Sequence, residues 1–449
     1  MNLNRFCFVL IATVFTSFLV YGALYIYLFS AGSLNFDIIK RMTGIQMQGS
    51  FPFSLLSNYT NAKVLLDKIT PVTVNIVNCR KLFDGDPLEM KKTYKLLENY
   101  NPKVINDKEY VNMTKNCSSF RNTRGYIRSP LNSLEEMFPL AFSIVMYKDV
   151  YQAERLLRSI YRPQNIYCIH VDRKAARDVK EAMKCIASCF ENVFIASQLH
   201  SVRWGTISVL DAELSCMTEL LPKHKSWKYF INLTGQEFPL RTNYELVRIL
   251  TVYNGANDIW GTTDRRWHAR WKDAGKPPYN IRPLKGSVHI VANRDFVNFL
   301  ITNRTAQEFY KWTKKTRVPD ETFFPTLNYN PQFGVRGQYN GSKPSHKVRS
   351  FSRLKIWTQR TGAGCHGKIV RGICILGIGD LPLLRRRDEF FVNKFHWNYQ
   401  SFTLDCMEEL YFNRTRNEYE GNGNINTSVY EKAEIVKYSV KKEMTKTTV

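Results

Sequence analysis

Apolar strand patterns alternate regularly with helix patterns between residues 138 and 252, which leaves few folds open to this chain. Short buried runs predict strands at 138–147, 165–171, 192–196 and 227–233. Helical periodicity falls between them at 150–161, 175–189, 206–221 and 243–252, the last with Asn243 as N-cap. This alternation predicts an α/β fold with a parallel, doubly wound sheet that binds ligands at the carboxyl ends of its strands.

The best-known nucleotide-binding motifs are missing from this region. No dinucleotide-type glycine fingerprint follows the first predicted strand, and the chain has no P-loop. Its one D-x-D sequence, Asp84-Gly85-Asp86, precedes the α/β region and follows no clear strand, so we interpret it as a turn. The sequence therefore predicts no acidic metal site of the kind that bridges phosphates.

Two cations near the carboxyl end suggest another way to hold a phosphate. Arg371 lies between Cys365 and Cys374, and a glycine-rich turn at 377–380 and then Lys394 follow it. A short disulfide would fix the arginine, and a guanidinium with an ammonium can together hold a diphosphate. From these residues alone, a surface disulfide beside solvated cations is the more common explanation.

The amino terminus predicts a membrane anchor. Residues 6–29 are uncharged, apolar and long enough to span a bilayer as one helix. No small-residue cleavage site of the A-x-A kind follows, so we expect an uncleaved signal anchor between a cytoplasmic tail at 1–5 and a stem at 30–73. The charges flanking the span do not decide its orientation.

Cysteines and glycosylation sequons instead place the rest of the chain in an oxidising lumen. Nine of the ten cysteines follow the span, and no C-x-x-C pair suggests a zinc or thioredoxin site. Expected N-glycosylation sites also follow it, at Asn58, Asn112, Asn116, Asn303, Asn340, Asn413 and Asn426. A further sequon at Asn232 lies in the apolar run 227–233, where we expect a buried strand residue.

Charge and composition divide this luminal part. The net charge of +25 is spread along the chain. The luminal location excludes nucleic acid, so this charge favours anionic substrates such as nucleotide sugars and sialylated glycans, although a basic solvated surface explains most of it. Residues 74–135 are polar and need disulfides to hold them, 136–410 carry the core, and 411–449 form a polar tail expected to be poorly ordered.

Four motifs then occur in order: Asn-Ile-Tyr-Cys-Ile-His-Val-Asp at 165–172, Cys-Phe-Glu-Asn-Val-Phe-Ile-Ala-Ser at 189–197, Trp-Lys-Tyr-Phe-Ile-Asn-Leu-Thr-Gly-Gln-Glu-Phe-Pro-Leu-Arg-Thr at 227–242, and Val-Asn-Lys-Phe at 392–395. The chain from about 138 to 406 thereby resembles the core 2/I-branching β1,6-N-acetylglucosaminyltransferases of glycosyltransferase family 14. The resemblance implies a GT-A-like fold, a UDP-sugar donor substrate, inversion at the anomeric carbon, and no metal or other cofactor.

The resemblance also implies roles for single residues. Glu321, in a Pro-Asp-Glu sequence, would be the catalytic base, and Phe323 and Phe324 would desolvate it and raise its basicity. Arg371 and Lys394 would neutralise the leaving diphosphate. Without the resemblance, Glu321 would be an ordinary acidic residue at a helix start.

Substrate contacts are implied in the same way. Uracil and ribose contacts are expected from Val145, Asp172 and Trp204, the last replacing a family tyrosine. Acceptor contacts are expected from Asp258, Trp260, Arg266 and Trp357. Trp260 stands where the family has a glutamate, and Gln359 replaces a tyrosine. We therefore expect GlcNAc, or else Glc, to be transferred in β1,6 linkage to a core 1 type O-glycan.

The resemblance pairs the cysteines as Cys79–Cys406, Cys117–Cys189, Cys168–Cys216 and Cys365–Cys374, leaving Cys185 over. Together with the expected anchor and lumen, it implies a single-pass type II protein of the Golgi membrane whose partners are a UDP-sugar and a glycoprotein O-glycan. Two alternatives stay open. One is I-type branching or a xylosyltransferase-like activity on another acceptor, although xylosyltransferases are usually longer. The other is a non-catalytic lectin, against which the retained Glu321, Arg371 and Lys394 argue.

Overall fold

A computed structural model describes residues 72–342, 348–358 and 364–441, except the side chains of Arg265 and Arg266. The expected cytoplasmic tail, membrane span and almost all of the stem, with Asn58, lie outside these residues. Within them, every helix is too short or too polar to cross a membrane. The described residues belong to one compact unit.

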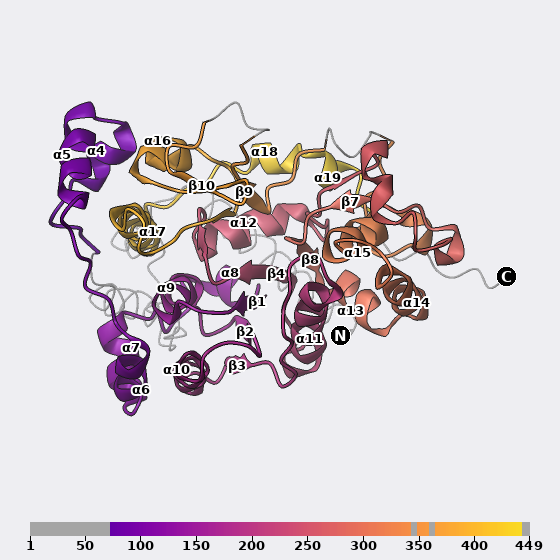
Figure 1. The fold of residues 1–449 in the computed structure, drawn as a ribbon, viewed down its shortest axis with the longest axis horizontal. Helices are drawn as coiled ribbons and strands as arrows, with labels where there is room; N and C mark the ends of the chain where they lie inside the picture. Colours follow the sequence, from indigo (N-terminus) through magenta and orange to yellow (C-terminus); the bar gives the residue numbers. More distant parts are fainter. Residues whose placement is uncertain (1–71, 343–347, 359–363, 442–449) are drawn as a thin grey trace, which may run out of the picture. The chain divides into compact units, whose positions relative to one another are not determined.

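A five-stranded sheet with strand order β3-β2-β1-β4-β8 forms the centre of this unit (Figure 1). Its strands are β1 (Leu140–Met146), β2 (Ile166–Val171), β3 (Val193–Ile195), β4 (Tyr229–Thr234) and β8 (Val291–Asn293). The pairs β1–β2, β1–β4 and β2–β3 are parallel, and only the edge pair β4–β8 is antiparallel. The predicted α/β fold with a mostly parallel sheet is confirmed.

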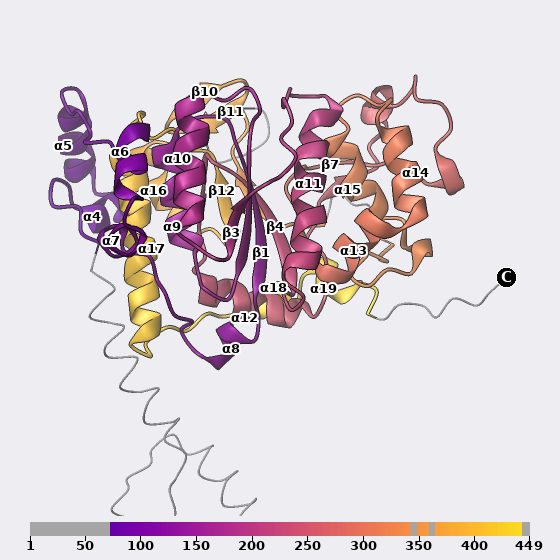
Figure 2. The same cartoon turned by 90° about the horizontal axis from the view of Figure 1, so that it is seen from below.

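Helices cover both faces of this sheet (Figure 2). On one side are α9 (Val150–Ile160) and α10 (Arg177–Ser188), whose core also includes side chains of α12 (Asn243–Tyr253). On the other side are α11 (Ile207–Lys223), α13 (Arg294–Thr302), α14 (Arg304–Thr313) and α15 (Asp320–Asn328). Each side of the sheet has its own hydrophobic core. Because strand side chains alternate, Phe142 of β1 lies in the core under α9 and α10, and Ala141 lies in the core under α11 and α13. One prediction is wrong: Thr242, not Asn243, caps α12, because Asn243 is buried and bonds Glu135 and Asn165.

Smaller sheets carry the segments that border the site. They are β5 (Glu237–Pro239), β12 (Phe391–Asn393) and β9 (Arg353–Lys355) in the order β5-β12-β9; β6 (Gly261–Thr262) with β7 (Lys285–Gly286); and β10 (Lys368–Val370) with β11 (Ile373–Ile375). Short 3₁₀ turns occur at η1 (Arg265–Arg270), η2 (Pro278–Asn280), η3 (Pro331–Phe333) and η5 (Ile378–Asp380). A third core joins β9, β11 and β12 to α16 (Leu381–Arg385) and α17 (Phe402–Tyr419).

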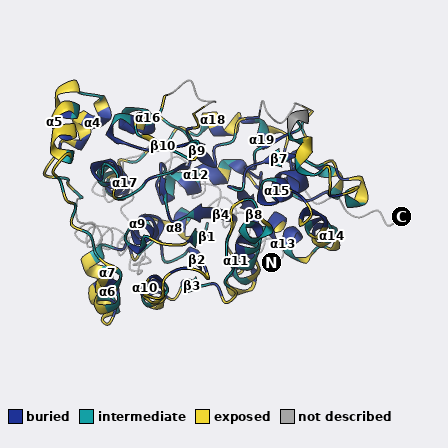
Figure 3. Ribbon diagram, in the orientation of Figure 1, coloured by how far each residue is buried: buried dark blue, intermediate teal, exposed yellow. Residues whose placement is uncertain are grey.

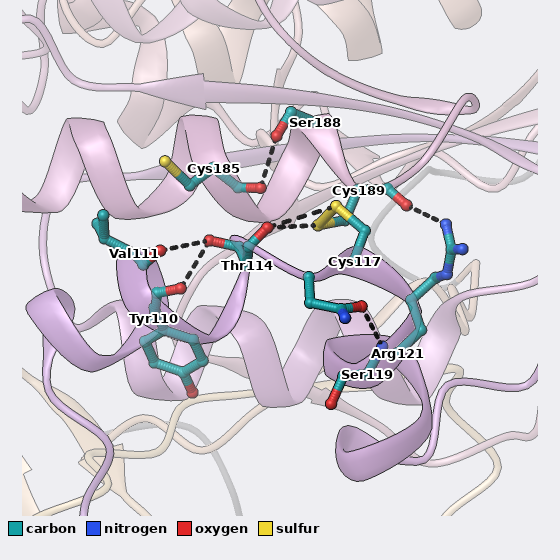
Figure 4. The surroundings of a disulfide bond; sticks show 10 residues. Tyr110, Val111, Thr114, Cys117, Ser119, Arg121, Cys185, Ser188 and Cys189 are labelled. Atoms are coloured by element: carbon teal, nitrogen blue, oxygen red, sulfur yellow. Dashed lines mark hydrogen bonds between the residues drawn. A yellow bond between two sulfur atoms is a disulfide. The ribbon is translucent and has the colours of Figure 1, made fainter.

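The amino-terminal helices are held by disulfides, as predicted. They are α4 (Cys79–Asp84), α5 (Pro87–Leu97), α6 (Asp107–Met113), α7 (Cys117–Arg124) and α8 (Ser133–Glu136), of which α5 is largely exposed (Figure 3). All four expected disulfides are present, namely Cys79–Cys406, Cys117–Cys189, Cys168–Cys216 and Cys365–Cys374. Cys185 is free, with its sulfur turned away from the neighbouring Cys117–Cys189 bond (Figure 4). The sequence 84–86 is a turn: Gly85 ends α4 at φ 77°, and Asp86 caps α5.

The expected poorly ordered tail is wrong for residues 411–441. α17 continues through Asn413, and α18 (Ser428–Glu431) and α19 (Glu434–Lys437) follow it. Tyr430 and Ile435 are each 1% exposed, and the Tyr430 hydroxyl donates to the carbonyl of Asp388. A few well-spaced apolar side chains therefore anchor a segment whose average composition is polar.

The sequons differ in exposure. Asn112, Asn116, Asn340 and Asn426 are exposed, whereas Asn303 and Asn413 are half-buried. Asn232 is 1% exposed on β4, where its amide donates to the carbonyl of Val288 and accepts from the N–H of Ile290. The expectation of a buried strand residue at this position is confirmed.

Candidate active site

A cavity of about 650 Å³ opens beside the amino end of α15, and we call it the Glu321 pocket. Its described lining includes four tryptophans, Trp204, Trp260, Trp267 and Trp357. Five cationic side chains also line it: Arg270, Lys285, Arg349, Arg353 and Lys355. Glu321 is the one carboxylate among these described lining residues. The pocket thus combines flat apolar surfaces, which suit sugar rings, with one candidate base.

Glu321 is held by two cations at the start of α15. Its Oε2 lies 2.7 Å from Nη1 of Arg270, which comes from η1, and 3.6 Å from Nζ of Lys285, which comes from β7. The Lys285 ammonium lies 5.0 Å and 5.1 Å from the ring centres of Trp260 and Trp267. The Glu321 side chain stays 25% exposed. A fixed carboxylate open to a cavity can accept a proton from a bound hydroxyl.

Phe323 and Phe324 do not surround this carboxylate. Both are fully buried in the core below α15, where Phe323 stacks 6.0 Å from Phe309. Residues two apart on a helix do not share a face, so Glu321 can meet the pocket while Phe323 meets the core. The predicted desolvation by these rings is wrong; Glu321 is surrounded by cations and indoles instead.

A buried polar network lies behind the pocket, and we call it the Glu237 network. Glu237, fully buried, lies 2.8 Å from Nε2 of His289 and 3.1 Å from Nε of Arg353, and it accepts from Asn393 at 2.7 Å. Burial opposes ionisation, but the charge of Arg353 and the hydrogen bonds from His289 and Asn393 lower the pKa of Glu237 to about 2. Burial lowers the pKa of His289 to about 4, so its ring is neutral near pH 7. Lys355 completes the network through a 3.3 Å contact with His289 Nδ1.

A second cavity of about 320 Å³ contains both cations predicted to hold a diphosphate, and we call it the Arg371 cleft. Arg371 and Lys394 line it together with Lys148, Gln236 and His396. Burial, and then the charges of Arg371 and Lys148, lower the pKa of Lys394. A lysine whose pKa is lowered by neighbouring cations is in an electropositive site, which favours a bound anion.

The position of Arg371 follows from a tight hairpin. Arg371 and Gly372 form the two-residue loop between β10 and β11, and their φ values of 51° and 82° are those of a type I′ turn. Gly372 tolerates this conformation easily, whereas a non-glycine residue such as Arg371 is uncommon there. The Cys365–Cys374 disulfide ties β11 to the preceding chain. The expected pinned arginine loop is present.

A third cavity of about 460 Å³ lies at the carboxyl ends of the parallel strands, and we call it the Asp172 pocket. It is lined by Val145 from the end of β1, by Asp172 directly after β2, and by Gly235 directly after β4. Asp172 accepts from the backbone N–H of Lys174 at 2.8 Å and of Val202 at 3.2 Å. These bonds and the Lys174 ammonium hold the pKa of Asp172 below its ordinary value, although burial acts against them.

The three cavities are neighbours along one path. Lys148 and Gln236 line both the Asp172 pocket and the Arg371 cleft. Arg371 lines the Arg371 cleft, and the next residue, Gly372, lines the Glu321 pocket. Donor and acceptor sites in such an arrangement would meet at the Arg371–Gly372 turn.

The remaining predicted contact residues fall into three groups. Trp260 and Trp357 line the Glu321 pocket, and so does Trp204, which is 85% exposed and is absent from the described lining of the Asp172 pocket. The Arg266 side chain lies outside the described part. Asp258 does not fit an acceptor role. It is fully buried, and its carboxylate accepts from the Tyr253 hydroxyl at 3.0 Å, the Phe351 N–H at 2.8 Å and the Ser350 hydroxyl.

Several lining residues had no recognised signal in the sequence. Arg270, Lys285 and Lys355 come from a 3₁₀ turn and two short strands, and Lys148 and Gln236 follow strands β1 and β4. The only usable signal for Lys148 and Gln236 was their place just after predicted strands, because ligands gather at that edge. Arg270, Lys285 and Lys355 lie in segments too short to show a helical or strand periodicity in the sequence.

Comparison with known proteins identifies the family of this chain. Residues 140–385 match the model of the family described as "Core-2/I-Branching enzyme". A similar protein from Danio rerio, "Beta-1,3-galactosyl-O-glycosyl-glycoprotein beta-1,6-N-acetylglucosaminyltransferase 4", is 36% identical over 369 residues, which cover 76% of this chain and 85% of the relative. The Homo sapiens protein of the same name numbered 3 is 35% identical over 368 residues, covering 74% and 82%.

A matched family model over more than half of the chain, together with such relatives, defines the class of this protein: it is a glycosyltransferase. Within that class, the chain belongs to the Core-2/I-branching enzyme family.

Proposed function

We propose that this protein is an inverting glycosyltransferase that moves GlcNAc, or Glc, from a UDP-sugar in β1,6 linkage to a core 1 type mucin O-glycan without a metal ion. The observation that carries the proposal is the meeting of two unlike cavities at one turn. Gly372 lines the cavity of the carboxylate Glu321, and Arg371 lines the cavity of the cations. An inverting displacement needs a base and leaving-group stabilisation on opposite sides of one carbon.

The residues divide the chemistry between them. Asp172 receives the uridine at the carboxyl end of β2. Arg371 and Lys394 bind the diphosphate, Arg371 as a planar fork and Lys394 as a point charge. Glu321 takes the proton from the acceptor hydroxyl while the oxygen of that hydroxyl attacks the anomeric carbon. The bond from that carbon to the diphosphate oxygen breaks, and UDP leaves with its charge neutralised by the two cations.

Two features support a glycan acceptor. Trp357 is 41% exposed at the Glu321 pocket, and an exposed indole face there can pack on a pyranose ring. The relatives are named as transferases that act on β1,3-galactosyl-O-glycosyl-glycoproteins. We propose either GlcNAc or Glc as the donor sugar because Trp260 and Gln359 differ from the family pattern.

We also place the enzyme in the Golgi membrane as a single-pass type II protein with its catalytic part in the lumen. The four disulfides and the exposed sequons at Asn112, Asn116, Asn340 and Asn426 support an oxidising lumen. The apolar stretch 6–29 supports an anchor.

The test is a donor and acceptor panel with the purified full-length protein. UDP-GlcNAc, UDP-Glc and UDP-xylose are each incubated with a core 1 disaccharide, an I-type acceptor and a serine peptide, in excess EDTA. We expect a β1,6-linked product from the core 1 disaccharide with UDP-GlcNAc or UDP-Glc. Activity that EDTA abolishes and Mn²⁺ restores would contradict metal independence. Xylose transfer to the peptide would favour the xylosyltransferase alternative, and glycan binding without transfer would favour a lectin.

A further inference from the structure

We propose that the natural acceptor carries an acidic group, a sugar carboxylate or a sulfate ester, and that the Lys355 ammonium binds it. The inference deepens the proposed function and rests on it, because it concerns what the Glu321 pocket recognises besides the attacking hydroxyl.

The charges around the Glu321 pocket do not balance. Of its five cationic lining residues, Arg353 pairs with Glu237 at 3.1 Å and Arg349 with Asp388 at 2.8 Å. Arg270 and Lys285 share the single carboxylate of Glu321. Lys355 has no described carboxylate at ion-pair distance. Among the described residues, the pocket therefore has more positive than negative charge, which favours an anionic ligand.

The contacts of Lys355 hold its ammonium at the lining of this pocket. Its ammonium donates to the Ser287 hydroxyl at 2.9 Å and to Nδ1 of His289 at 3.3 Å. His289 can accept there because its Nε2 faces the Glu237 carboxylate at 2.8 Å, which fixes the tautomer. An ammonium has three protons, so one donor remains for a ligand in the cavity that Lys355 lines.

A merely structural role explains this lysine poorly. A half-buried ammonium without a carboxylate partner costs free energy, and Ser287 and His289 offer it only neutral partners. A methionine or glutamine would fill the same space without that cost. A bound oxyanion would supply the missing charge, and the indole of Trp357, which lines the same pocket, would supply the flat surface for the ring that bears the acid.

The acidic group belongs to the acceptor rather than to the donor. The cations expected on the diphosphate, Arg371 and Lys394, line the Arg371 cleft, which does not include Lys355 among its described lining residues. Lys355 lines the Glu321 pocket together with the candidate base. A substitution at Lys355 should therefore change acceptor recognition and leave UDP affinity unaltered.

The experiment compares a neutral core 1 disaccharide with the same disaccharide bearing a uronic acid or a sulfate. Binding to the full-length protein with UDP present is measured by calorimetry, and kcat/KM is measured with the accepted donor. We expect the acidic acceptors to bind and react roughly 10- to 100-fold better, the size of one charge-assisted hydrogen bond. The uronic acid and sulfate arms show which oxyanion is preferred.

Two variants assign the preference. In Lys355→Met the ratio between acidic and neutral acceptors should fall towards one, while UDP affinity stays unchanged. Lys92→Met, which removes an exposed charge on α5, is the matched control and should keep the ratio. If Lys355→Met does not fold, the same measurements are made on Lys355→Gln.

The outcomes separate the two proposals. Equal affinity of the unchanged protein for acidic and neutral glycans would overturn the inference, and so would a preference that survives in both Lys355 variants. Weaker UDP binding in Lys355→Met would move the lysine to the donor side and also overturn it. A protein that binds acidic glycans selectively but transfers no sugar would contradict the proposed function while supporting the inference.

Discussion

Glu237→Gln should destabilise the folded protein strongly although it changes few atoms. Glu237 is fully buried and meets His289 at 2.8 Å, Arg353 at 3.1 Å and Asn393 at 2.7 Å. Glutamine keeps the shape of the side chain but removes the charge. The Arg353 guanidinium, which is 1% exposed, would then stay buried without its counter-ion.

The loss of stability in Glu237→Gln should be about 3 kcal/mol, for two reasons. The pKa of Glu237 falls from 4.5 to about 2 on folding, which corresponds to about 3 kcal/mol of stability. Removing one partner from a buried ion pair typically costs about 3–5 kcal/mol, because the remaining charge is uncompensated. We therefore expect a loss of about 3 kcal/mol in the free energy of unfolding at neutral pH.

The sign of the pH dependence follows from the lowered pKa. The contribution of Glu237 is complete above its unfolded pKa of 4.5 and is lost as pH falls towards about 2. The assay is denaturant unfolding of the purified protein and of Glu237→Gln, Arg353→Met and the double variant between pH 7 and pH 3. The two single variants should be non-additive, with the double variant costing less than their sum. A loss below about 1 kcal/mol, or strict additivity, would refute the reasoning.

Two further predictions concern the site, and a third concerns the carboxyl-terminal helices. Arg371→Lys keeps the charge but loses the planar fork, so UDP should bind more weakly and turnover should fall more than stability does; unchanged UDP affinity and rate would make Arg371 a mere surface cation. The preference for acidic acceptors should persist to about pH 7 and disappear as pH rises through about 8, because burial lowers the pKa of Lys355 to about 8; Lys355→Met should show no such step. The charged or titratable groups that face Lys355 are Glu321, Lys285, Arg353, Glu237 and His289. Tyr430→Ala should cost about 3–5 kcal/mol in unfolding experiments if the carboxyl-terminal helices are anchored as described, and a cost near zero would contradict that packing.

Strong periodicity made the central sheet predictable. The four runs at 138–147, 165–171, 192–196 and 227–233 are apolar because both faces of each parallel strand are covered by helices. The position of Asp172 after β2 was equally predictable, because the end of a strand is marked in the sequence. The cysteine pairing came from the resemblance to a family, since sequence spacing alone does not fix connectivity.

Other parts of the site depend on contacts that no local pattern reports. Lys285 and Arg270 meet Glu321 from different segments, and neither segment has a helical or strand period long enough to read. Phe323 and Phe324 were expected beside the base because they are close in sequence, yet both rings are fully buried in the core. Asp258 is likewise a core residue, because Tyr253 and the Ser350–Phe351 segment supply its hydrogen bonds.

The proposed sugar transfer requires Glu321 as its base, and one pair of variants tests that role. Glu321→Gln and Asp320→Asn are neighbouring changes of a carboxylate to an amide, but Glu321 lines the pocket whereas Asp320 is 6% exposed and absent from its described lining. Transfer rate and UDP affinity are measured for both variants. We expect Glu321→Gln to lose about 10²–10⁴-fold in rate with unchanged UDP affinity, and Asp320→Asn to keep a rate close to that of the wild-type protein. Near-normal transfer by Glu321→Gln, or an equal collapse in Asp320→Asn, would contradict the role of Glu321 as the base.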